Sequence, residues 1–126
     1  MVVENRMKRD PITISPETGI LEASRLLRQH KIRHLPVVKG GRLVGILTDR
    51  DLKRVSPSPA TSLSVYELNY LLDKLEAKEV MTKQVVSVTP KTTIEEAARL
   101  LLAHKIGGLP VVEGNRVVGI VTIRDL

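Results

Sequence analysis

Hydrophobic positions along the chain change their spacing in the same order twice. Short apolar runs at residues 12–14 and 85–88 each end at a turn signal containing proline, a pattern typical of short β-strands. After each run, small and apolar side chains recur at the spacing of one helical face (Ile20, Ala23, Ser24, Leu27; Ile94, Ala97, Ala98, Leu101). Thr93 with Glu96 forms a capping-box pattern, and Gly19 with Glu22 a weaker one. We therefore expect helices to begin near residues 20 and 94.

Each predicted helix is followed by two apolar runs separated by a glycine-containing turn. Residues 35–38 and 43–47 flank Lys39-Gly40-Gly41, and residues 109–112 and 117–121 flank the corresponding turn. Two such runs around a short turn predict a β-hairpin. A second helix is expected to begin near Asp51, whereas the chain stops at Leu126 in the second copy. The predicted order of each copy is thus β-α-β-β-α, with the final helix of the second copy truncated.

The two halves are copies of one sequence. One ungapped shift places Met7 on Met81 and Leu52 on Leu126, and it aligns HKIRHLPVV with HKIGGLPVV and RLVGILTDRDL with RVVGIVTIRDL. Two copies are too few for a solenoid, so we expect a pseudo-twofold pair with a shared buried face. We place the repeats at residues 7–54 and 80–126.

The linker at residues 55–79 is predicted to be ordered in its second half. It opens on the polar stretch Ser56 to Pro59, which has no apolar pattern. From Ser64 to Lys78 the apolar residues follow a helical spacing, and Ser64 with Glu67 forms a capping-box pair. We therefore expect one helix over residues 64–78.

The composition of the chain limits the classes of function that it can have. The 126 residues include no Cys, which excludes disulfides and thiol chemistry, and the motifs Gly-x-Ser-x-Gly, the P-loop and His-Glu-x-x-His are missing, so we expect no enzyme and no metal site. The formal charge of +6 favours an anionic partner, but aromatic residues make up 2%, so small phosphates fit at least as well as nucleic acid. Because no apolar run is long enough to span a membrane, we expect a soluble cytoplasmic protein.

A Thr and an Asp recur where the last strand of each copy meets the next helix. They are Thr48 and Asp51 in the first copy and Thr122 and Asp125 in the second. One interpretation is a local helix cap. The other is a nucleotide site, because a helix start attracts phosphate and a carboxylate can accept both hydroxyls of a ribose.

These repeated motifs resemble the CBS domain pair, or Bateman module, and in particular stand-alone bacterial and archaeal CBS-pair proteins of the acetoin-utilisation type. The resemblance covers nearly the whole chain. It implies an α+β fold in which two β-α-β-β-α repeats pack through three-stranded sheets about a pseudo-twofold axis. It also implies two clefts that bind AMP, ADP, ATP or S-adenosylmethionine as a regulator, with no cofactor required.

The resemblance also implies roles for individual residues. Asp51 and Asp125 would hold ribose hydroxyls, and Thr48 and Thr122 the ribose or phosphate. The adenine pocket would be lined by backbone around two groups of residues (Thr13, Ile14, Val86, Ser87; Leu35, Pro36, Leu109, Pro110). Cations for the phosphates would be supplied by side chains from both copies (Lys31, Arg33, His34, Arg50, Arg124). Gly108 would also line a cleft, in the position that His34 has in the first copy. Because Gly107 and Gly108 replace Arg33 and His34 in the second copy, and Ile123 replaces Asp49, we expect two inequivalent clefts.

The predicted function is a regulatory sensor of adenosine ligands that acts through the clefts and through dimer packing. The resemblance implies a homodimer in the form of a four-repeat disc and an unidentified effector protein or domain. The alternative is a structural dimerisation or nucleic-acid-binding module whose clefts are unused. The charge of +6 keeps nucleic acid open as a partner.

Overall fold

A computed structural model describes residues 1–55 and 64–126 of the chain. The predicted polar stretch Ser56 to Pro59 lies outside these residues. The first half contains η1 (Val3–Asn5), β1 (Lys8–Arg9), α1 (Ile20–His30), β2 (His34–Lys39), β3 (Arg42–Thr48) and α2 (Asp49–Val55). The second half contains α3 (Val65–Lys74), α4 (Ala77–Val80), α5 (Ile94–His104), β4 (Gly108–Glu113), β5 (Arg116–Thr122) and η2 (Ile123–Asp125). The predicted α+β class is confirmed.

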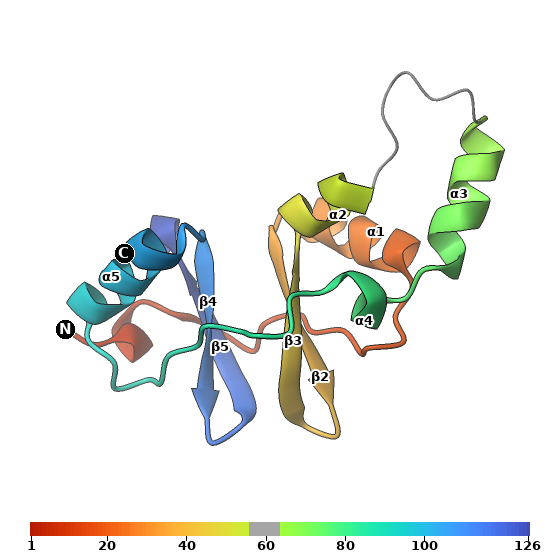
Figure 1. Cartoon of the computed structure of the whole chain (residues 1–126). Coiled ribbons are helices and arrows are strands. Elements are labelled where there is room, and N and C mark those ends of the chain that lie inside the picture. The colour runs from red at the N-terminus through yellow and green to blue at the C-terminus, as the bar shows by residue number, and fades with distance from the viewer. Residues whose placement is uncertain (56–63) are drawn as a thin grey trace.

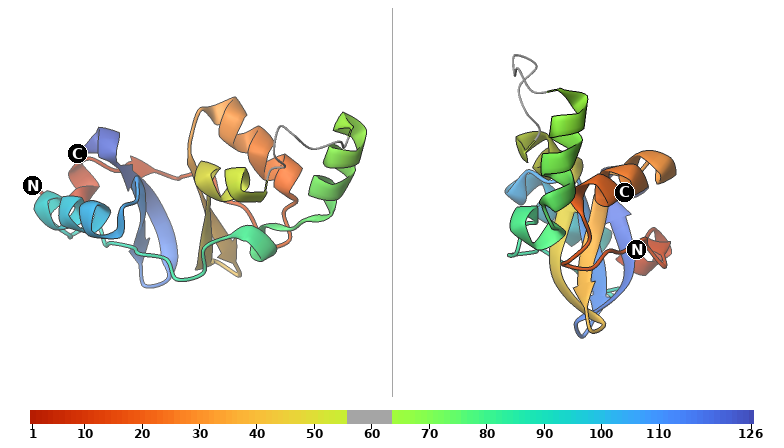
Figure 2. Two further views of the ribbon diagram at one scale, coloured as in Figure 1. Left: turned by 45° about the horizontal axis from the view of Figure 1, so that its top comes forward. Right: turned by 90° about the vertical axis from the view of Figure 1, so that its right-hand side faces the viewer.

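The two predicted hairpins form the centre of the molecule. β2 pairs with β3 and β4 pairs with β5 in the same antiparallel register, with Leu35 opposite Leu47 and Leu109 opposite Val121. Figures 1 and 2 show the hairpins side by side, with α5 on one side and α1 and α2 on the other. A backbone hydrogen bond from the Leu43 N–H to the Asn115 oxygen, 2.9 Å long, joins the two hairpins.

Each hairpin carries its own apolar core under one helix. Leu35, Val37 and Leu47 pack with buried residues of α1, and Leu109 and Val111 pack with buried residues of α5 (Ile20, Ala23, Leu27; Ala97, Leu101). These are the helical positions that the apolar spacing predicts. The predicted helix starts are also confirmed, although only the second has a side-chain cap, because the Thr93 hydroxyl accepts from the Glu96 N–H at 3.1 Å and Gly19 has no side chain.

The short strand predicted at the start of each repeat is present only as a single bridge, so it is shorter than the apolar runs suggest. Ile14 pairs in parallel with Val37, and its counterpart Val88 pairs with Val111. The strand ends at once because the next backbone N–H is used elsewhere. Ser15 N–H donates to the Thr18 hydroxyl, and the second repeat makes the same turn one residue after Val88.

The first residues of each repeat cross to the hairpin of the other repeat. β1 pairs with β5 through Lys8 and Ile120, and Thr82 bridges Ile46 of β3. The third strand of one sheet is therefore β1, so its order is β1-β5-β4, whereas β2 and β3 form a two-stranded sheet. In Figure 1 the red N-terminal segment accordingly lies near α5, and α4 lies beside the first repeat.

Two glycines make this crossing possible. Met7 lies against Gly119 of β5, and Met81 lies against Gly45 of β3. A Cβ at Gly119 would stand 2.8 Å from the Met7 Sδ and 2.9 Å from the Lys8 backbone oxygen, closer than side chains normally approach. The repeated glycine before Ile46 and Ile120 therefore serves the close approach of the crossing segment.

The linker helix is shorter than predicted. α3 begins with the predicted capping box, in which the Ser64 hydroxyl accepts from the Glu67 N–H at 3.2 Å, but it ends at Lys74. The helix stops because Leu75 is extended and its carbonyl accepts the N–H of Ile20 at 3.0 Å, which ties the chain to the start of α1. The expectation of one helix to residue 78 is therefore wrong. Within residues 1–55 and 64–126, none of the helices combines the length and the apolar character that crossing a membrane requires.

Candidate functional site

A cleft of about 400 Å³ lies between the two repeats, at the end of β3 where α2 begins. One wall comes from the first repeat and includes the junction between β3 and α2. The other wall comes from the crossing segment at residues 82–86 and from residues 106–108, where β4 begins. This volume lies within the range of small-ligand sites. The site therefore exists only because the two repeats pack together.

Thr48 and Asp51 form a reciprocal cap at this junction. The Thr48 N–H and hydroxyl donate to Oδ2 of Asp51 at 2.9 and 3.1 Å, and the Asp51 N–H donates back to the Thr48 hydroxyl at 3.2 Å. The carboxylate is 2% exposed, so these bonds also compensate its removal from water. The local helix cap, one of the two interpretations of the sequence, is thus present, and it holds the carboxylate in one orientation.

The other carboxylate oxygen of Asp51 forms an ion pair with a solvent-exposed side chain. Its Oδ1 is paired with the guanidinium of Arg54, one helical turn later in α2. The Arg54 side chain is 67% exposed, so its guanidinium can leave without disturbing packed atoms. Asp51 therefore has one oxygen committed to the cap and one oxygen held by an exchangeable cation.

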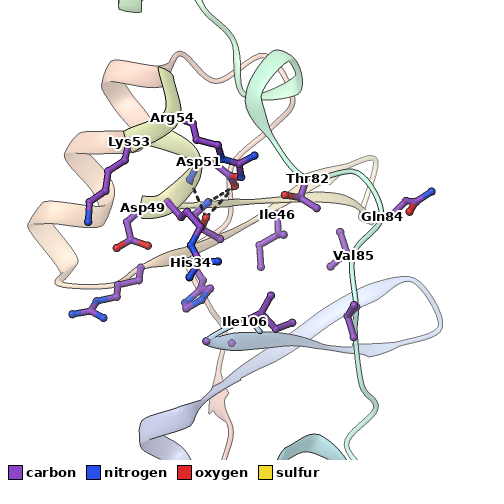
Figure 3. Close-up of a pocket in the computed structure, with 16 residues that line it drawn as sticks. His34, Ile46, Asp49, Asp51, Lys53, Arg54, Thr82, Gln84, Val85 and Ile106 are labelled. Carbon is purple, nitrogen blue, oxygen red and sulfur yellow. Dashed lines mark hydrogen bonds and ion pairs between the residues drawn. The ribbon is translucent and has the colours of Figure 1, made fainter. Parts of the chain in front are cut away.

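The lining of the cleft is divided between charge and apolar surface. Four cations line it, of which Arg50, Lys53 and Arg54 belong to α2 and Arg33 precedes β2. Four apolar side chains also line it (Ile46, Val85, Val86, Ile106). Figure 3 shows Lys53 and Asp49 on one side of the cleft and Val85 and Ile106 on the other.

His34 lies at the contact between the repeats. A Cβ at Gly108, the equivalent of His34 in the second repeat, would stand 3.0 Å from the imidazole Cε1. Burial lowers the pKa of His34 below its usual value, and among smaller effects Asp49 raises this pKa and Arg33 lowers it. The imidazole therefore favours the neutral state, and Gly108 is needed to leave room for it.

The cleft brings together seven of the residues predicted from the sequence (Arg33, His34, Thr48, Arg50, Asp51, Val86, Gly108). Leu35 and Leu109 instead pack in the hairpin cores, and Pro36 and Pro110 are also fully buried and do not line this cleft. Ile14 is also buried, and both its backbone groups pair with β2, through the Pro36 oxygen and the Val38 N–H. The other predicted residues, Lys31, Thr13 and Ser87, are exposed and do not line this cleft.

The second predicted site, at the end of β5, repeats the cap. The Thr122 N–H and hydroxyl donate to Oδ2 of Asp125 at 2.9 and 3.1 Å, as in the first repeat. Arg124 is exposed beside them, and Ile123 is 63% exposed where the first repeat has Asp49. The inequivalence of the two sites stays a prediction.

Several residues of the cleft are missing from the sequence-based set. Arg54 is three residues after Asp51, so helical spacing alone would have found it, whereas Lys53, two residues after Asp51, has no such signal. Thr82, Gln84 and Val85 come from the crossing segment, whose destination has no signal in the local pattern. Val86 corresponds to Ile12 in the repeat alignment, so Ile12, not Ile14, is its equivalent.

The sequence model of the CBS domain matches residues 3–58 and 77–126. The CBS domain-containing protein YhcV of Bacillus subtilis (strain 168) is 35% identical over 124 residues, which cover 98% of this chain and 81% of that protein. Inosine-5'-monophosphate dehydrogenase of Korarchaeum cryptofilum (strain OPF8) is 38% identical over 126 residues, which cover 98% of this chain and 23% of the dehydrogenase. The chain therefore spans less than a quarter of that relative.

Solved structures agree with the fold. A putative acetoin utilization protein, AcuB, from Vibrio cholerae has a TM-score of 0.81 and 34% identity, covering 99% of this chain and 86% of that chain. The CBS domain pair of protein MJ0100, in complex with 5'-methylthioadenosine and S-adenosyl-L-methionine, has a TM-score of 0.81 and 31% identity, covering 99% and 91%. CBSX2 in complex with AMP has a TM-score of 0.81 and 30% identity, covering 98% and 91%. The chain thus belongs to the CBS domain family and carries a tandem pair of these domains.

Proposed function

We propose that the chain is a regulatory module that binds an adenosine ligand (AMP, ADP, ATP or S-adenosylmethionine) in the cleft beside Asp51. The observation that carries this proposal is the capped carboxylate of Asp51, which faces a cleft of about 400 Å³ built from both repeats. The AMP complex of CBSX2 and the 5'-methylthioadenosine and S-adenosyl-L-methionine complex of MJ0100 support it, because both are of similar fold and about 30% identical.

In the proposed complex the ribose hydroxyls donate to Asp51. Thr48 already fixes Oδ2 through two hydrogen bonds, so the carboxylate is oriented before the ligand arrives. Preorganisation of this kind lowers the entropy cost of binding. The ribose hydroxyls take the place of Arg54 on Oδ1, and the adenine lies against the apolar wall that includes Val85 and Ile106.

The ligand acts as a regulator because it contacts both repeats at once. A ligand that fills the cleft favours the packing in which the walls contributed by α2 and by residues 82–86 are close together. We propose that an effector protein or domain senses this packing and that two chains associate as a homodimer. In this role the module itself catalyses no reaction.

A thermal-shift panel of AMP, ADP, ATP, 5'-methylthioadenosine and S-adenosylmethionine tests the proposal. A ligand at about 100 times its Kd adds about 2.7 kcal/mol of apparent stability, which is readily measured. We expect a shift that Asp51→Asn abolishes, because the amide presents a donor to hydroxyl donors while keeping an acceptor for Thr48. Asp125→Asn, the matched change in the other repeat, should retain the shift from this cleft. If no ligand shifts the melting temperature, the nucleotide proposal is wrong and the alternative of a dimerisation or nucleic-acid-binding module gains weight.

A further inference from the structure

The lining of the cleft carries more positive than negative charge, and this bears on the choice of ligand. The cations Arg33, Arg50, Lys53 and Arg54 stand against two carboxylates, Asp49 and Asp51. All four cations are exposed, whereas Asp51 is buried and already bonded to Thr48. The charge that a ligand meets at the rim is therefore positive.

The positive charge is also concentrated on one side. Arg50, Lys53 and Arg54 belong to a single short helix, α2, while the opposite wall carries Val85 and Ile106. Figure 3 shows this division, with Lys53 on the α2 side and Val85 and Ile106 across from it. An adenosine ligand whose ribose lies at Asp51 and whose adenine lies on the apolar wall directs its 5' substituent toward the cations of α2.

We propose that this cleft selects adenosine ligands with a 5'-phosphate over those with a 5'-thioether or sulfonium group. The proposal rests on the function proposed above and names its ligand class. A 5'-phosphate brings negative charge to the cations of α2. 5'-Methylthioadenosine has no charge to offer there, and S-adenosylmethionine brings a sulfonium and an ammonium against one carboxylate.

Arg54 links the ribose contact to the phosphate contact. In the free protein its guanidinium pairs with Oδ1 of Asp51, so a ribose must displace it. A phosphorylated ligand compensates this loss, because the displaced guanidinium meets the phosphate and forms a charge-assisted pair there. A ligand without phosphate displaces Arg54 and leaves it in solvent. Arg54 therefore opposes the binding of an unphosphorylated nucleoside and favours that of a nucleotide.

Titration calorimetry with AMP, 5'-methylthioadenosine and S-adenosylmethionine on the full chain tests this selection. We expect AMP to bind at least about tenfold more tightly than 5'-methylthioadenosine, from several exposed charge pairs each of modest strength, and S-adenosylmethionine to bind most weakly. Equal or tighter binding of either sulfur compound overturns the selection and leaves the proposed function standing. Binding of none of the three, together with no thermal shift from ADP or ATP, overturns both.

Three variants test which residues cause the preference for AMP. Arg54→Ala should weaken AMP binding roughly threefold or more and should not weaken 5'-methylthioadenosine binding, because it also removes the competitor for Asp51. Lys53→Ala should also reduce the preference for AMP over 5'-methylthioadenosine, but it does not remove a competitor for Asp51. Lys39→Ala removes the same charge at the far end of β2 and should leave the preference unchanged. A preference that survives Arg54→Ala and Lys53→Ala, or that falls as much in Lys39→Ala, contradicts the assignment.

Discussion

The crossing of the N-terminal segment onto β5 can be tested by adding one methyl group at Gly119. The new Cβ would stand 2.9 Å from the Lys8 backbone oxygen, and Lys8 cannot retreat without losing its pairing with Ile120. Overpacking of this kind costs about 1–3 kcal/mol. We therefore expect Gly119→Ala to lower the free energy of unfolding by about 2 kcal/mol.

Gly45→Ala is the matched change in the first repeat. Its nearest neighbours are three atoms of the flexible Met81 side chain, with no backbone atom among them. We therefore expect Gly45→Ala to lower the free energy of unfolding by about 1 kcal/mol or less. Met81→Ala should remove part of this loss, which a double-mutant cycle would show as a favourable coupling. Met7→Ala should not relieve Gly119→Ala to the same extent, because the Lys8 oxygen stays in place. Urea unfolding followed by circular dichroism measures these differences. Equal losses at the two glycines, or a larger loss at Gly45, would refute the reasoning.

Three further predictions concern a helix cap, the pH dependence of stability and the oligomeric state. Thr93→Ala removes the α5 cap and should cost about 1 kcal/mol in urea unfolding, whereas Gly19→Ala, with no side-chain cap to lose, should cost far less. Burial lowers the pKa of His34, so the unfolded state binds the proton more tightly, and the His34 contribution to stability, complete above pH of about 6.5, should decline as pH falls through the folded-state pKa. His34→Gln should flatten this decline between about pH 7.5 and 5. Light scattering should find the dimer mass; a monomer at all concentrations contradicts the predicted homodimer.

The local sequence pattern predicts those elements whose hydrogen bonds join residues close together in the chain. The hairpins and the helices α1 and α5 follow from apolar spacing, glycine turns and caps, and all lie where the sequence predicts them. α3 ends early for a different reason. Leu75 continues the helical spacing, but its carbonyl bonds to Ile20, far away along the chain, and tertiary contact overrides propensity there.

The crossing segments could not be predicted from periodicity, which identifies a strand but not the sheet that it joins. β1 is two exposed charged residues, Lys8 and Arg9, with no apolar alternation to reveal it. The remaining signal was the pairing of a repeated Met with a repeated Gly, since Met7 and Met81 contact Gly119 and Gly45.

The repetition in the sequence identifies the centre of the candidate site. Thr48 and Asp51 recur in the second copy, so repetition identified them, and the structure places them in the cleft. The opposite wall at residues 82–86 depends on the crossing and was largely missed. Strand alternation would have corrected one assignment, because His34 faces the cleft and its neighbour Leu35 must then face the core.

A crystal structure of the chain with AMP tests the central claim most directly. The account predicts AMP between the repeats, with its ribose hydroxyls on the Asp51 carboxylate, its adenine against Val85 and Ile106, and Arg54 turned from Asp51 toward the phosphate. AMP bound elsewhere on the chain, or bound with the pair of Asp51 and Arg54 intact, would contradict it.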